Sequence, residues 1–139
     1  MAKSKLDRIL RVRTLQLGLV QAEESRAQER AASEALLKSR IAQLVEGVSP
    51  APAPVAGFSL IAAAHFRQRL HQSAEAAEGR LRAAQAVAER AAEATREARR
   101  DQSAIEKLIA RAQADAALKE IRALETAPPS RKIRHDPCL

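Results

Sequence analysis

The chain has 139 residues and a formal net charge of +7, with 24 lysines and arginines against 17 acidic residues. Two phenylalanines are its only aromatic residues and 32 residues are alanine, whereas a compact core relies on large apolar side chains. The composition therefore argues against an ordinary globular domain and favours long helices or coiled coils.

The positive charge is concentrated at the two ends of the chain. Residues 1–13 contain five basic residues against one acidic residue, and residues 127–139 contain three against one. Basic ends predict contact with an acidic protein surface, nucleic acid or a membrane. The single cysteine, Cys138, cannot form an internal disulfide, and no apolar run of about 18 residues is present. We therefore expect a cytoplasmic protein.

The prolines divide the chain, because proline breaks the interior of a helix. All six lie in two clusters, at residues 50–54 and 128–137. Gly47 is expected to cap the end of a first helix and Ser59 the start of a second. The expected segments are a first helix over 1–46, an uncharged proline-rich loop over 47–58, a second helix over 59–126 and a disordered basic tail over 127–139.

The first helix has an irregular apolar stripe, interrupted by Arg13, Glu24, Glu34 and Lys38. The spacing of the apolar residues is nevertheless that of one helix face. The stripe consists of Leu6, Leu10, Leu17, Val20, Ala27, Ala31, Ile41 and Val45.

The second helix has a regular seven-residue repeat, which is typical of a coiled coil. One row of the repeat is entirely apolar, and seven of the nine residues in the companion row are apolar or threonine. The first row is Ala63, Leu70, Ala77, Ala84, Ala91, Ala98, Ile105 and Ala112. The second is Leu60, Arg67, Ala74, Leu81, Ala88, Thr95, Gln102, Ile109 and Ala116.

These features predict an all-α fold, an antiparallel two-helix coiled-coil hairpin with a longer second helix. A turn near Pro52 would place residue 20 near residue 84 and leave about 25 residues of the second helix unpaired after residue 100. Pairs four residues apart are expected to support the helices: Glu34 with Lys38, Glu78 with Arg82, and Asp115 with Lys119.

Nothing in the sequence indicates catalysis. The histidines and the cysteine have no metal-ligand spacing, and there is no glycine-rich phosphate loop. We expect no enzymatic activity, no cofactor or metal, and no small-molecule substrate. The basic N-terminus lacks the aromatic residues that stack on nucleic-acid bases, so we expect protein partners in place of nucleic acid.

The segments 5–29 and 93–116 resemble the flagellar type III export stalk and chaperone family (FliJ-like), which is related to the central stalks of rotary ATPases. The matching features are a start of alternating basic and apolar residues, later runs of Ala, Glu, Arg and Gln, and a longer second helix. The resemblance implies that the end bearing both termini inserts into a hexameric export ATPase. It also implies that the loop end contacts the cytoplasmic domain of the export gate, with export chaperones as further partners.

Residues with suitable chemistry lie at both expected contact regions. The candidate ATPase-binding residues are Lys5, Arg8, Arg11, Arg13, Ile105, Ile109, Leu118, Ile121 and Leu124. The candidate gate-binding residues are Leu37, Ile41, Leu44, Phe66 and Leu70. The resemblance also implies where the protein is located in the cell: in the cytoplasm, peripherally associated with the inner-membrane export apparatus. The alternatives are a generic coiled-coil adaptor or scaffold, the stalk of another secretion system, or a basic nucleic-acid-associated coiled coil.

Overall fold

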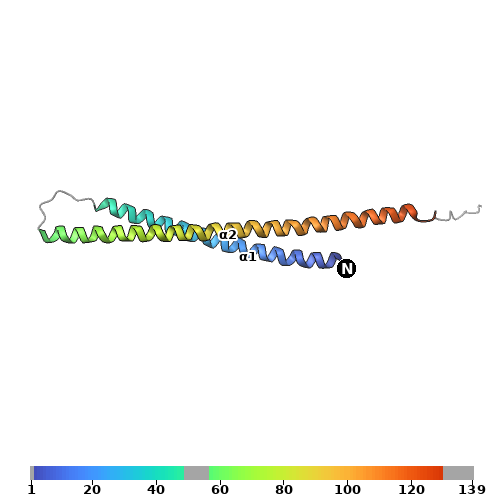
Figure 1. Cartoon of the computed structure of the whole chain (residues 1–139), viewed down its shortest axis with the longest axis horizontal. Coiled ribbons are helices and arrows are strands. Elements are labelled where there is room, and N and C mark those ends of the chain that lie inside the picture. The colour runs from blue at the N-terminus through green and yellow to red at the C-terminus, as the bar shows by residue number, and fades with distance from the viewer. Residues whose placement is uncertain (1, 49–56, 130–139) are drawn as a thin grey trace, which may run out of the picture.

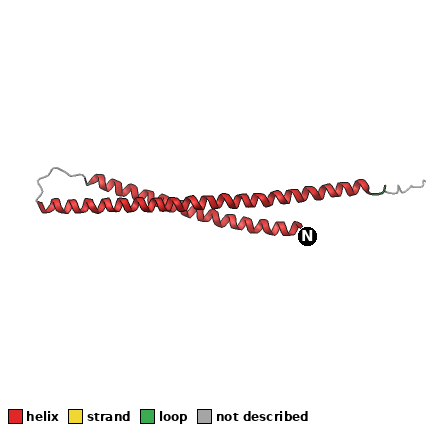
Figure 2. Ribbon diagram, viewed as in Figure 1, coloured by secondary structure: helices red, strands yellow, loops and turns green. Residues whose placement is uncertain are grey.

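The computed structural model describes residues 2–48 and 57–129, and the described part contains two helices and no strand. Helix α1 spans Ala2–Gly47 and helix α2 spans Gly57–Thr126. They cross at a shallow angle and run in opposite directions as a long, thin hairpin (Figures 1 and 2). The predicted all-α hairpin with a longer second helix is therefore confirmed.

The helix ends differ in detail from the prediction. Gly47 is the last helical residue and its φ is not positive, and the N–H of Val48 still donates to the carbonyl of Leu44 at 3.2 Å. Ser59 does not cap α2, because the helix begins two residues earlier at Gly57. Helix α2 ends just before Pro128 and Pro129, as the restriction on residues preceding proline requires. Most of the predicted loop and of the predicted tail lies outside the described residues.

One row of residues on each helix forms the seam between them. The seam residues recur at alternating intervals of three and four, the a/d spacing of a left-handed coiled coil. On α1 and the residue that follows it, the buried or half-buried seam residues are Leu6, Leu10, Arg13, Leu17, Val20, Glu24, Ala27, Ala31, Glu34, Lys38, Ile41, Val45 and Val48. On α2 they are Ala63, Arg67, Leu70, Ala74, Ala77, Leu81, Ala84, Ala88, Ala91, Thr95, Ala98, Gln102, Ile105 and Ile109. The burial pattern confirms the predicted stripe on α1 and most of the predicted repeat on α2.

Five polar contacts between the helices fix which residues face each other. In each contact the two residue numbers add up to between 114 and 116, so Val20 lies beside Thr95. The predicted neighbourhood of residues 20 and 84 is wrong by about three helical turns. That prediction assumes that both helices end level with the turn, whereas α2 begins well beyond the end of α1. The contacts are Arg13–Asp101, Thr14–Gln102, Val20–Thr95, Glu34–Arg80 and Lys38–Glu78.

Helix α2 protrudes beyond α1 at both ends (Figure 1). In this register Val48 lies level with Arg67, so residues 57–66 extend past the end of α1. Every residue from 111 to 129 is exposed, so the unpaired C-terminal part of α2 is shorter than the 25 residues expected. Leu60, Ala112 and Ala116 are exposed for the same reason, although the repeat predicts them in the seam.

Candidate protein-binding sites

The basic residues at the start of α1 fall into two groups. Lys5, Arg8 and Arg11 are exposed, whereas Arg13 lies in the seam. The Arg13 guanidinium donates to Asp101 Oδ2 at 3.1 Å and to Gln16 Oε1 at 3.2 Å. Arg13 therefore joins the two helices, and three of the four candidate basic residues are exposed for a partner.

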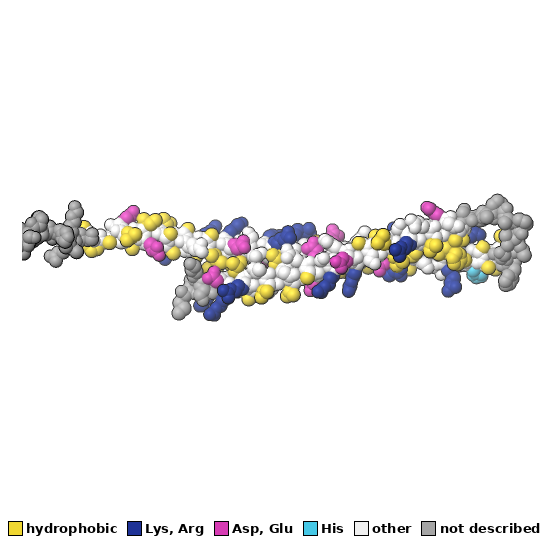
Figure 3. All heavy atoms as spheres, turned by 180° about the vertical axis from the view of Figure 1, so that it is seen from behind, with side chains coloured by type: hydrophobic (Ala, Val, Ile, Leu, Met, Phe, Trp, Pro, Cys, Tyr) yellow, Lys and Arg dark blue, Asp and Glu magenta, His cyan; other side chains and the backbone are white. Residues whose placement is uncertain are grey.

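The apolar candidates at the same end divide in a similar way. Ile105 and Ile109 are half-buried in the seam, where the register places them opposite Leu10 and Leu6. Leu118, Ile121 and Leu124 lie on the unpaired part of α2 and are 51%, 51% and 76% exposed, respectively. Figure 3 shows hydrophobic side chains along this protruding segment. The first pair contributes to the shaft of the hairpin, and the last three form a surface that a partner can cover.

At the loop end, three of the five candidate gate-binding residues are exposed. Leu37, Leu44 and Phe66 are 40%, 56% and 52% exposed, respectively. Ile41 and Leu70 are half-buried seam residues, so their side chains pack between the helices. Leu37 and Leu44 are seven residues apart and therefore lie on one face of the coiled coil.

Several exposed apolar residues are missing from the predicted sites. They flank the seam on α1 and α2, and their repeat at intervals of three and four or of seven is the signal that reveals them. They are Ile9, Val12, Leu19, Val87 and Leu108.

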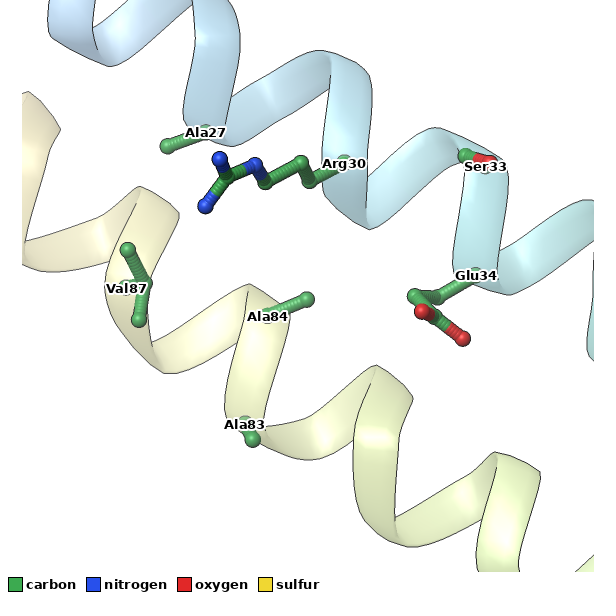
Figure 4. Close-up of a pocket in the computed structure, with 7 residues that line it drawn as sticks. All are labelled: Ala27, Arg30, Ser33, Glu34, Ala83, Ala84 and Val87. Carbon is green, nitrogen blue, oxygen red and sulfur yellow. The ribbon is translucent and has the colours of Figure 1, made fainter.

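The two edges of the seam differ in chemistry. One edge is lined by Arg30 on α1 and Val87 on α2, and we call it the Arg30 edge. It carries three adjoining grooves, which run from Arg13 and Asp101 to Glu34 and Ala83. In Figure 4 the Arg30 side chain extends from α1 across one groove towards Val87 on α2. Heptad spacing extends this edge from Arg30 to Leu37 and Leu44, and from Val87 to Phe66. The opposite edge, which carries the Lys38–Glu78 ion pair, has no exposed large apolar residue within 6–48 or 67–109.

Two glutamates on α2 have lowered pKa values. A hydrogen bond from Arg82 at 2.8 Å, together with the charge of Lys38, lowers the pKa of Glu78. A hydrogen bond from Arg96 at 2.6 Å does the same for the pKa of Glu93. Their stabilising effect is complete above the ordinary glutamate pKa and is lost as pH falls through the lowered values. Both carboxylates are therefore ion-pair partners on the surface of the rod.

The predicted helix-supporting pairs are only partly present. Glu78 pairs with Arg82 as expected, whereas Asp115 and Lys119, both within the described part of α2, form no ion pair with each other. Glu34 and Lys38 do not pair with each other, because each has a partner on the other helix: Arg80 at 3.4 Å and Glu78 at 3.9 Å, respectively.

No group of three or more histidines, cysteines and acidic residues that could hold a metal ion occurs within the described ranges. The two helices also contain no segment both long and apolar enough to cross a membrane. Comparisons with family models, curated proteins and solved structures found no match to this chain.

Proposed function

We propose that this chain is the stalk of a flagellar type III protein export apparatus, a non-catalytic component that acts by binding other proteins. The observation that carries the proposal is the protruding C-terminal part of α2, residues 111–126, beside the basic start of α1. The chain resembles the export stalk family over residues 5–29 and 93–116, which include the basic start of α1 and reach the first residues of the protruding part of α2.

The shape of the terminal end suits insertion into a ring. After residue 110 the rod consists of α2 alone. Its width there is that of a single helix, about 10–12 Å. The exposed Lys5, Arg8 and Arg11 would steer this end towards an acidic pore, and Leu118 and Ile121 would slow its release. The partner at this end is a hexameric export ATPase.

The loop end is assigned to the export gate. Leu37, Leu44 and Phe66 form the exposed apolar surface expected for contact with the cytoplasmic domain of the gate protein. The protein would thus lie in the cytoplasm, associated peripherally with the inner-membrane export apparatus. Its two ends would connect the ATPase to the gate.

A stalk acts through differential affinity, because it must bind the assembled ring more tightly than the separate subunits. It should therefore raise the specific activity of the ATPase most at low ATPase concentration. The experiment titrates the full-length chain into the cognate export ATPase and measures phosphate release. Replacing Leu118, Ile121 and Leu124 with Ala should raise the half-maximal concentration by about tenfold or more.

The matched control replaces three exposed apolar residues at the other end, Leu36, Leu60 and Ile61, with Ala. This triple variant should stimulate the ATPase like the unmodified chain. Equal stimulation by both triple variants, or no stimulation by the unmodified chain, would show that stalk insertion is not the mechanism.

A further inference from the structure

The Arg30 edge of the hairpin carries unpaired positive charge. Five arginines flank it within residues 23–47 and 66–90, and none of them takes part in an ion pair among the described residues. Arg80 also lies there but is paired with Glu34 at 3.4 Å. The five are Arg26, Arg30, Arg40, Arg69 and Arg90, and the acidic residue that flanks the same stretch is Glu23.

The same stretch also exposes apolar side chains. Leu37 and Leu44 on α1 and Phe66 and Val87 on α2 are each 40% to 56% exposed. Arg30 and Val87 line two adjoining grooves, the first of which is drawn in Figure 4. Arg26 and Arg90 line the second groove. Exposed apolar residues in a row beside free cations form a surface that is suited to a helix with apolar and acidic residues on one face.

The opposite edge has the reverse character. Over the same stretch it carries Glu46, Glu75, Glu78 and Glu89, of which Glu78 is paired with Arg82 and Lys38, and it exposes no large apolar residue. Two copies of the chain that met through their Arg30 edges would bring like charges together. If the Arg30 edge met the opposite edge of a second copy, its apolar residues would find no apolar counterpart. A second copy of this chain is therefore a poor occupant.

We propose that the Arg30 edge binds an acidic amphipathic helix of a partner protein, as the third helix of a coiled coil. The apolar residues of that helix cover Leu37, Leu44 and Val87, and its carboxylates pair with Arg26, Arg30 and Arg90. The stretch spans about 25 residues, or about 37 Å of helix. This contact lies on the side of the rod and needs no export ATPase. It shares Leu37 and Leu44 with the surface proposed for the export gate, so the partner helix and the gate would compete for those two side chains.

The test uses a labelled synthetic 28-residue helix with Leu at the a and d positions and Glu at the flanking e and g positions. A second peptide with Lys in place of Glu serves as the charge control. Fluorescence anisotropy with the full-length chain should show binding of the acidic peptide, weakened by salt, and no binding of the basic peptide. Equal binding of the two peptides, or no binding of the acidic one, would overturn the proposal.

Variants of the chain locate the contact. Replacing Arg26, Arg30 and Arg90 with Glu should weaken acidic-peptide binding by about tenfold or more. The matched control reverses three cations away from this edge, Arg11, Arg99 and Lys107, and should change binding by less than about twofold. Circular dichroism should show equal helicity for both variants. An equal loss of binding in the control would reduce the effect to net charge and refute a site on this edge.

Two measurements address the other occupants. Sedimentation of the chain alone should show a monomer at the concentrations used, and a dimer disrupted by the three edge reversals would identify a second copy as the occupant. An oligothymidylate that displaces the acidic peptide and binds more tightly would identify a phosphate backbone. Either result would replace the proposed occupant. Since no ATPase is present in these assays, their failure is separable from failure of the stalk function.

Discussion

Alanine occupies much of the interface between the helices. Ala27 and Ala77 are the buried apolar residues of the described chain, and Thr95 is buried with its hydroxyl hydrogen-bonded to the carbonyl of Ala91 at 3.1 Å. An alanine side chain removes little apolar area from water, so the seam layers formed by alanine contribute little stabilisation. Stability is therefore spread over many small contacts along the rod.

Because the alanines of the seam bury little apolar area, the helix propensity of single residues makes a comparatively large contribution to the free energy of unfolding. Gly18 and Gly79 lie in helix interiors, and a Cβ added at either would meet no atom within 4 Å. Replacing either glycine with Ala should raise the free energy of unfolding by about 0.5–1 kcal/mol. Denaturant unfolding followed by circular dichroism measures the change.

The reverse substitution provides the control. Ala32 is exposed in the middle of α1, so Ala32→Gly should lower the free energy of unfolding by a similar amount. Destabilisation by Gly18→Ala or Gly79→Ala would mean that these positions contact a neighbour that the isolated hairpin lacks.

At the scale of the helices, the sequence predicts what depends on local periodicity. It correctly assigns Leu17 and Ala98 to the seam, because the a/d pattern is a property of each helix alone. It does not predict the register, since pairs such as Arg13–Asp101 join residues 88 positions apart. An alanine-rich seam offers few large side chains whose fit would reveal that register from sequence.

For the candidate sites, too, local periodicity predicts some exposures, whereas others depend on how the two helices are aligned. Leu37, Leu44 and Phe66 can be recognised as exposed because they lie off the repeat. Ile105 and Ile109 fall on the repeat, and only the position of α1 beside them decides that they are covered.

Engineered cysteines test the register directly. In a Cys138→Ser background, Leu17→Cys with Ala98→Cys should crosslink within one chain when treated with a short bismaleimide, because the register places the two residues opposite each other. Val20→Cys with Ala84→Cys, the pair expected from a turn centred on Pro52, should not. Electrophoresis and mass measurement distinguish crosslinks within a chain from those between chains. Efficient reaction of the second pair alone would contradict the observed register.

At the scale of the whole molecule, the hairpin consists of a two-helix shaft with single-helix ends. The shaft pairs residues 6–48 with 67–109, and α2 alone continues in both directions (Figure 1). Helices without a packing partner are marginal in water, so the ends should open far more often than the shaft.

Hydrogen exchange should report this difference. Amides of residues 111–126 should exchange quickly, whereas those of residues 74–105 should be protected up to the global stability of the hairpin. Mass spectrometry of peptic fragments resolves the two regions. Strong protection at residues 111–126 in the isolated chain would mean that this segment is packed against something in solution, and adding its true partner should produce such protection.

The extension of α2 past both ends of α1 has a thermodynamic consequence. The helix is about 105 Å long, so ligands bound at its two tips would share no side chain, and their binding free energies should simply add. Occupying one tip would leave the intrinsic affinity of the other unchanged. The chain would then work as a tether of fixed length, raising the effective concentration of one bound protein near the other without any change in its own shape.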